Sequence, residues 1–287
     1  MNQIAIISGK GGTGKSSISA AFATIERNNI LADCDVDAAN LYLIFNPVHE
    51  EEVVYIGSNI AVINYSKCTN CGNCFNICRF DAIEYIDGII TIKEISCDGC
   101  FLCYRICSEN AIHMQKNDKS RMYAGAYRNG KMVYGILAPG EENSGKLVSL
   151  IREKAKKLAE ENNCQTIILD GPPGVGCPVI STISGVSKVV IVTEPTMSGL
   201  YDMIRAVEIT QKFNIIPTII INKYTINLDM MRQISDWCKN HNLQVAGCIP
   251  FSNEIVEAMV QKKSIIELDE NSEISKIILK IYETLIQ

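Results

Sequence analysis

Residues 4–24 read IAIISGKGGTGKSSISAAFAT, and this stretch decides the fold. Within it, residues 9–16 fit the pattern G-x-x-x-x-G-K-[ST] of a phosphate-binding loop. The apolar, β-branched run Ile4 to Ile7 predicts a strand before the loop, and the alanine-rich run Ser16 to Thr24 predicts a helix after it. A strand, a loop and a helix in this order are the setting in which such a loop binds a nucleotide.

The loop has the residue types that hold the phosphates of a nucleotide. Its glycines let the backbone turn N–H groups inward, and the start of the following helix adds a positive dipole end. We expect Lys15 to neutralise the β- and γ-phosphates and the Ser16 hydroxyl to reach Mg²⁺. The alternative is a glycine-rich turn that binds nothing. The candidate nucleotide-binding residues here are Gly9, Lys10, Gly11, Gly12, Thr13, Gly14, Lys15, Ser16 and Ser17.

Lys10 is a second lysine in this loop, and a phosphate-binding loop needs only Lys15. The run K-G-G-x-G-K, residues 10–15, resembles the deviant phosphate loop of MinD/ParA-type ATPases, which include the nitrogenase iron protein and Mrp-type iron–sulfur carriers. The resemblance implies a homodimer with ATP at the interface, in which Lys10 reaches the partner's nucleotide and acts in catalysis beside Lys15. The alternative is an exposed lysine that only adds charge.

Length and composition restrict the class of protein. The 287 residues, 47% of them hydrophobic, suffice for one large domain or for one domain with a small insertion. A net charge of −5 argues against a nucleic-acid partner, and no apolar run approaches the ~20 residues that span a membrane. The start of the chain has no secretory pattern, and 13 cysteines then predict a cytoplasmic, metal-binding protein.

Strands and helices are predicted to alternate along most of the chain. Because the strands are apolar and β-branched, they indicate a doubly wound α/β domain with a mostly parallel sheet, a P-loop NTPase fold. A hairpin is predicted to turn at residues 129–130. The predicted strands are 30–35, 122–127, 131–137, 166–170, 188–193, 217–222 and 244–249; the predicted helices are 38–45, 146–160, 199–212, 229–240 and one from about residue 273.

A cysteine-rich segment interrupts this alternation. Residues 68–78 read CTNCGNCFNIC and residues 97–107 read CDGCFLCYRIC, so both fit C-x₂-C-x₂-C-x₃-C. The duplication resembles bacterial two-cluster ferredoxins, in which the fourth cysteine of each motif binds the other cluster. The resemblance implies one [4Fe–4S] cluster on Cys68, Cys71, Cys74 and Cys107, and a second on Cys97, Cys100, Cys103 and Cys78. A pair of structural zinc sites is the alternative.

The domain organisation follows from these two patterns. Residues 1–63 and 116–287 are predicted to form the ATPase domain, and residues 64–115 an inserted small α+β ferredoxin-type domain.

Acidic residues at predicted strand ends are candidates for catalysis and magnesium binding. Asp33 and Asp35 match the D-x-D of the MinD/ParA-type ATPases; the match implies that Asp35 activates the attacking water and that Asp33 supports the magnesium shell. Asp170 ends the apolar strand 166–169, and Mg²⁺ is its natural target. For each acid the alternative is a helix cap or turn residue.

Further candidates come from the same resemblance. Asn222 matches the family's adenine-reading asparagine, and Pro250 is expected to wall the base. Residues 171–176, GPPGVG, resemble the family's second switch. Cys177 has the spacing from Asp170 at which the nitrogenase iron protein keeps a ligand of its intersubunit cluster, so it is a candidate extra ligand; the alternative is a small residue packed at a helix start.

Together these features predict an ATP-hydrolysing iron–sulfur protein. The predicted function couples nucleotide-driven rearrangement of a homodimer to electron transfer or metallocluster assembly on a redox or metallocluster client protein. One alternative is a positioning or partition-type ATPase whose clusters are structural or sensory. Another is an ATP-dependent biosynthetic ligase.

Overall fold

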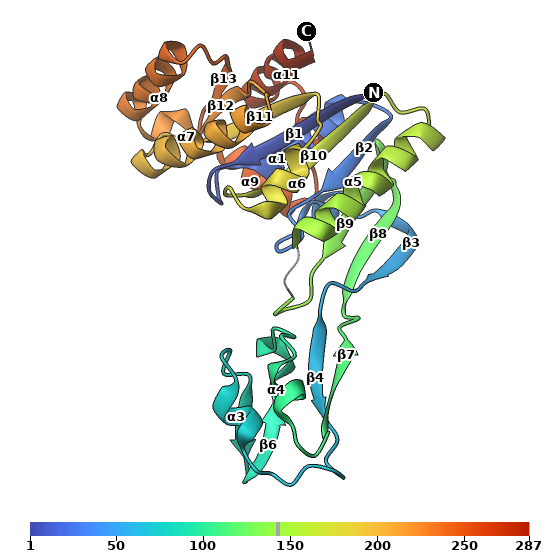
Figure 1. Ribbon diagram of the computed structural model, residues 1–287. Helices are drawn as coiled ribbons and strands as arrows, with labels where there is room; N and C mark the ends of the chain where they lie inside the picture. The colour runs from blue at the N-terminus through green and yellow to red at the C-terminus, as the bar shows by residue number, and fades with distance from the viewer. Residues whose placement is uncertain (142–143, 287) are drawn as a thin grey trace. The chain divides into compact units, whose positions relative to one another are not determined.

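The structure is a computed structural model that describes residues 1–141 and 144–286, and the chain divides into two compact units (Figure 1). The first unit comprises Met1–Glu52, Tyr123–Gly135 and Gly145–Gln287, and the second comprises Val53–Met122 and Ile136–Ser144. The second unit is wider than the predicted insertion, residues 64–115. One reason is that the strand Asn59–Ile63, which lies before the predicted insertion, pairs with the strand Ile112–Lys116 and so belongs to the same unit as the cysteine-rich segment.

A nine-stranded sheet is the centre of the first unit, with the order β13-β12-β11-β1-β10-β2-β9-β8-β3. The seven strands from β13 to β9 in this order run parallel, which confirms the predicted mostly parallel sheet. The bounds are β1 Asn2–Ser8, β2 Asn29–Asp33, β3 Val48–Tyr55, β8 Ser120–Tyr127, β9 Gly130–Ile136, β10 Thr166–Pro173, β11 Lys188–Thr193, β12 Thr218–Asn222 and β13 Val245–Ile249. The predicted hairpin corresponds to β8 and β9, whereas β3 was not predicted.

Helices cover both faces of this sheet (Figure 1). On one face α1, α10 and α11 pack on one another, and α1 and α11 also contact strands. On the other face α6 and α7 contact β1 and its neighbours β10 and β11, and α5 packs on β9. The bounds are α1 Lys15–Ile25, α2 Leu41–Phe45, α5 Ser144–Glu161, α6 Cys177–Ile183, α7 Met197–Lys212, the 3₁₀ turn η2 Tyr224–Ile226, α8 Leu228–Asn240, α9 Asn253–Val260, α10 Ile265–Leu268 and α11 Glu273–Ile286. Among the described residues, no helix combines the length and the apolar character that crossing a membrane requires.

The core of the first unit explains why α11 packs against α1. Apolar residues of α11 recur every three or four positions, which puts them on one face of the helix. Tyr282 from this face lies 5.0 Å, centroid to centroid, from the ring of Phe22 in α1, and both residues are buried. The apolar face of the final helix is therefore buried within the first unit.

The second unit is small and built from two similar halves. Its antiparallel strand pairs are β4 with β7 and β5 with β6. The bounds are β4 Asn59–Ile63, α3 Asn73–Ile77, β5 Ile83–Ile86, β6 Ile89–Ile92, the 3₁₀ turn η1 Glu94–Ser96, α4 Leu102–Ile106 and β7 Ile112–Lys116. Gly72 and Phe101, at equivalent positions of the two cysteine motifs, both have positive φ, 83° and 66°, and both precede a short helix. The duplication seen in the sequence is thus repeated in the backbone.

Candidate nucleotide site and candidate metal centres

The predicted phosphate-binding loop connects β1 to α1 and bounds a cavity of about 380 Å³. Residues 11–17 line this cavity together with Asp35, Asn40, Pro173 and Met259. Since the loop glycines meet the N-terminus of α1 here, backbone N–H groups and a helix dipole are available to phosphate oxygens. Of the loop residues predicted to bind a nucleotide, residues 11–17 line this cavity and Gly9 and Lys10 do not; their binding roles stay predictions.

Lys15 and Asp170 form a buried ion pair at the floor of this site. The Lys15 Nζ lies 2.9 Å from Asp170 Oδ1 and 3.9 Å from Asp35 Oδ2. Burial alone would lower the pKa of Lys15, but the carboxylates of Asp170 and Asp35 outweigh burial and raise it. The lysine is therefore a cation at neutral pH and is ready to pair with phosphate.

Oxygen donors around Asp170 suit a magnesium ion. The Ser16 hydroxyl donates to Asp170 Oδ2 at 2.7 Å, so two hard oxygen ligands are already adjacent. The Ser19 hydroxyl donates to Asp170 Oδ1 at 2.6 Å and fixes the carboxylate. Ser19 was not among the predicted site residues, although its place three positions after Ser16 puts it on the same side of α1.

Asp33 has a structural role that the sequence did not predict. Its buried carboxylate accepts the backbone N–H groups of Asp35, Asn40 and Leu41, each at 3.1 Å. Burial, followed by the charge of Asp170, raises the pKa of Asp33 to about 7. Asp33 thus shapes the loop that carries Asp35 into the cavity, and its part in the magnesium shell stays a prediction.

Lys10 is held within its own protomer. Its Nζ lies 2.7 Å from Glu194 Oε1 and donates to Ser198 Oγ at 2.9 Å and to Thr196 Oγ1 at 3.3 Å. Glu194 comes directly after β11, at the carboxyl end of the sheet. For Lys10 to reach a second subunit's nucleotide, this ion pair has to open.

Glu194 also connects Lys10, through Lys223, to Gly12 of the same loop. Its Oε2 lies 3.4 Å from Lys223 Nζ, which in turn donates to the carbonyl oxygen of Gly12 at 2.6 Å. Burial works to raise the pKa of Glu194, but the two ammonium groups outweigh it and lower that pKa. Neither Glu194 nor Lys223 was predicted as a site residue, because their contacts join parts of the chain that are far apart in sequence.

The residues predicted to contact the base do not line the cavity. Asn222 is buried, and its Nδ2 donates to the carbonyl oxygen of Thr13 at 2.8 Å. Pro250 is not part of the lining either, whereas Met259 of α9 is, and the Ser17 hydroxyl contacts its sulfur at 3.4 Å. The adenine-binding roles of Asn222 and Pro250 stay predictions.

Cys177, the candidate extra ligand, is the first residue of α6, and its side chain is exposed. Its role as a ligand stays a prediction.

Asn222 also explains why residue 14 has to be glycine. Gly14 has φ +89°, and a β-carbon there would lie 2.2 Å from Asn222 Nδ2. By contrast, a β-carbon on Gly11 would meet nothing within 4 Å. Gly14→Ala should therefore lower the free energy of unfolding of the nucleotide-free protein by about 2 kcal/mol, and Gly11→Ala by less. Urea unfolding measures the difference; equal midpoints for the two variants would contradict it.

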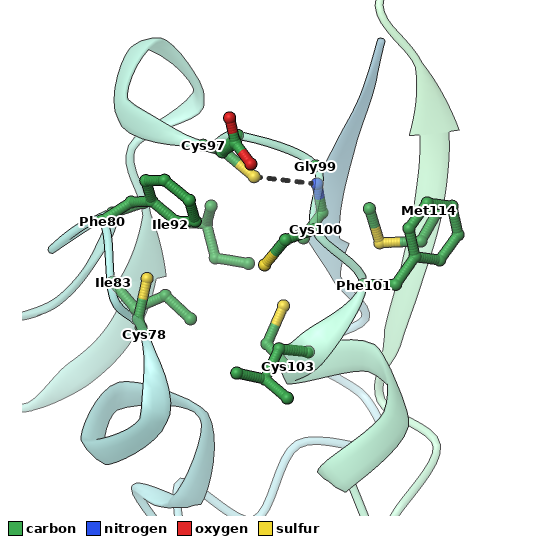
Figure 2. A pocket seen from close by; sticks show the side chains of 14 residues that line it. Cys78, Phe80, Ile83, Ile92, Cys97, Gly99, Cys100, Phe101, Cys103 and Met114 are labelled. Atoms are coloured by element: carbon green, nitrogen blue, oxygen red, sulfur yellow. Dashed lines mark hydrogen bonds between the residues drawn. The ribbon is translucent and has the colours of Figure 1, made fainter.

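The cysteine motifs form two cavities in the second unit. One is lined by Cys78, Cys97, Cys100 and Cys103, and Figure 2 shows the sulfur atoms of these four residues facing a common space. The other is lined by Cys68, Cys71, Cys74 and Cys107. Each cavity combines three cysteines of one motif with the last cysteine of the other, which is the combination that the ferredoxin resemblance implied.

The surroundings of these cysteines are apolar, and two of the sulfur atoms accept backbone N–H groups. Apolar side chains, including Phe80, Ile92 and Met114, complete the cavity in Figure 2. The N–H of Ala61 donates to Cys97 Sγ at 3.4 Å, and the N–H of Ala111 to Cys107 Sγ at 3.3 Å. Hydrogen bonds of this kind tune iron–sulfur clusters.

The described residues contain no ready-made site for a single metal ion. Within residues 1–141 and 144–286, no three or more His, Cys, Asp or Glu side chains are close enough to hold one metal ion. Four thiolates around a cubane bind four different irons, so they lie further apart than the ligands of one ion. The [4Fe–4S] clusters implied by the ferredoxin resemblance stay a prediction.

Comparison with known proteins gives a family and a fold. A family model described as the CobQ/CobB/MinD/ParA nucleotide binding domain matches residues 4–265. An uncharacterized protein of Methanocaldococcus jannaschii, MJ0578, is 37% identical over 286 residues, which are 99% of this chain and 96% of that protein.

Solved structures of low sequence identity share the fold. The cell division ATPase MinD of Pyrococcus furiosus has a TM-score of 0.61 at 16% identity, covering 99% of this chain and 98% of its own. The septum site-determining protein MinD of Pyrococcus horikoshii, complexed with Mg-ADP, has a TM-score of 0.62 at 16% identity, covering 99% and 95%. At these identities the likeness establishes the α/β fold alone.

Proposed function

Because the chain belongs to the CobQ/CobB/MinD/ParA nucleotide-binding family, we propose that it hydrolyses ATP as a homodimer and couples this to electron transfer or metallocluster assembly on a partner protein. The observation that carries the proposal is that one chain has both a phosphate-binding loop at a cavity and two cavities of four cysteines each.

The nucleotide site supplies groups for each part of the reaction. ATP phosphates replace Asp170 as the partner of Lys15, and the Asp170 carboxylate and the Ser16 hydroxyl would then hold Mg²⁺, which would neutralise phosphate charge. Asp35 lines the same cavity and orients the attacking water. Lys10 leaves Glu194 and stabilises the charge on the partner's γ-phosphate, so hydrolysis requires the dimer.

The cysteines of the second unit would hold two [4Fe–4S] clusters. Cys68, Cys71, Cys74 and Cys107 form one ligand set, and Cys78, Cys97, Cys100 and Cys103 form the other. When bound, such clusters supply one-electron transfer at a potential set by hydrogen bonds, charge and exposure.

A continuous strand provides a route for the coupling. Asp33 pairs with Tyr134 across the β2–β9 register, and β9 continues to Ile136, where the chain enters the second unit. A nucleotide that displaces the segment from Asp33 to Asp35 therefore acts on a strand that leads directly to the cysteine-rich unit.

The coupling predicts that ATP changes the cluster potentials. Anaerobically prepared protein should contain inorganic sulfide, and in EPR-monitored redox titrations Mg-ATP should shift at least one potential by about 60 mV, a tenfold change for one electron. The Lys15→Ala variant, which lacks the phosphate contact, is the control and should show no shift. ATPase activity should also differ between oxidised and dithionite-reduced protein.

The opposite result favours a different function. That result is sulfide in the protein, with cluster potentials that Mg-ATP leaves unchanged and ATP turnover that reduction leaves unchanged. In that case the clusters are structural or sensory. The chain would then be a positioning or partition-type ATPase; its fold is shared by a cell division ATPase MinD and a septum site-determining protein MinD.

A further inference from the structure

A second polar cavity, of about 290 Å³, is lined by residues of α5 and α6 in the first unit. It shares no lining residue with the cavity at the phosphate-binding loop. Its polar lining comes from Ser149, Arg152, Glu153 and Lys156 of α5 and from Ser181 and Ser184 at the end of α6. None of these residues has a role in the function proposed above.

Arg152 is a buried cation at this cavity. Its side chain is only 8% exposed, and its Nη atoms donate to the carbonyl oxygen of Ser181 at 2.6 Å and to Gln3 Oε1 at 3.2 Å. Both acceptors are neutral, and within the described parts of the chain Arg152 makes no ion pair and its Nε has no hydrogen-bond partner. A buried charge without a counter-ion is costly, so an anion supplied from solvent would stabilise this arrangement.

Lys156 adds a second positive charge. It follows Arg152 by four positions, which places the two side chains on the same side of α5, and it lines the same cavity. Lys156, too, forms no ion pair with any residue that the structure describes. The Ser181 hydroxyl is a further donor at the cavity. Glu153 is the acidic residue of the lining, but it is solvent-exposed, so its carboxylate can stay in water while an anion pairs with the two cations.

We propose that the cavity between α5 and α6 binds a phosphate-type oxyanion through Arg152, Lys156 and Ser181. The bound anion ties α5 to α6, because Arg152 already contacts the Ser181 carbonyl. Since α6 begins directly after residues 171–176, the segment that follows Asp170, occupancy of this cavity bears on the nucleotide site. This site is independent of the iron–sulfur proposal.

The test is a phosphate titration with the nucleotide site already filled. Protein saturated with Mg-ADP is titrated with inorganic phosphate at constant ionic strength, and binding is followed by calorimetry. Wild type should bind phosphate saturably, and Lys156→Gln should weaken that binding about tenfold, through loss of one charge-assisted contact. Lys157→Gln is the matched control, because it removes the same charge from the next residue, which is exposed and does not line the cavity.

Two results would overturn the proposal. One is the absence of saturable binding at millimolar phosphate, and the other is an equal loss in Lys156→Gln and Lys157→Gln, which would indicate general surface charge. Arg152→Gln should abolish binding, and if that variant fails to fold, the comparison of Lys156→Gln with Lys157→Gln still decides.

A parallel titration with glycerol 3-phosphate distinguishes free phosphate from a phosphate monoester as the ligand. Binding of both ligands means that phosphate monoesters enter the cavity, and binding of inorganic phosphate alone identifies the free ion.

Discussion

Cys107→Ala should remove the cluster of the first cysteine motif, although Cys107 belongs to the second. The reason is that Cys107 lines one cavity with Cys68, Cys71 and Cys74. Iron and acid-labile sulfide in anaerobically reconstituted protein should fall from about eight to about four per chain, the content of one cubane. Cys78→Ala should remove the other cluster with the same loss of iron.

Double variants identify which cluster is lost. Adding Cys68→Ala to Cys107→Ala should cost no further iron, because both residues line the same cavity. Adding Cys97→Ala instead should remove the remaining cluster, since Cys97 lines the other cavity. The reverse pattern would mean that each motif binds its own cluster, and iron without sulfide in the wild-type protein would rule out cubanes altogether.

Lys10→Ala should reduce ATP turnover by about 10³-fold or more, the range for a cation supplied across an interface. ATP affinity should change little, because Lys15 supplies the charge within the same protomer. Steady-state turnover and equilibrium binding of ATP separate the two effects. An equal loss in affinity and turnover would place Lys10 on its own protomer's nucleotide instead.

Glu194→Gln tests the role of Lys10 by changing its ion-pair partner. Removing the carboxylate releases Lys10, which now lies 2.7 Å from it, so the dimer should form at lower ATP concentration. Analytical ultracentrifugation with Mg-ATP measures this shift. Glu208→Gln is the matched control, because it removes the same charge from an exposed residue of α7. A weaker dimer in Glu194→Gln would mean that the ion pair belongs to the closed state.

Most of the parallel sheet was predictable because its signals are local. Strand β11 was predicted residue for residue, since a short apolar, β-branched run between polar segments has few alternatives. Strand β3 was missed because it lies at the edge of the sheet. Seven of its eight residues are exposed, so its sequence has no buried face to give an alternating pattern.

The sequence by itself determined the phosphate-binding loop and the two cysteine motifs, because these sites are made of residues at fixed short spacings. Only the tertiary structure decided that Lys10 pairs with Glu194, that Asp33 organises the loop before α2, and that Arg152 is buried without a counter-ion. These contacts depend on which strands are neighbours and on which side chains are removed from water. Neither property is encoded in the spacing of the residues concerned.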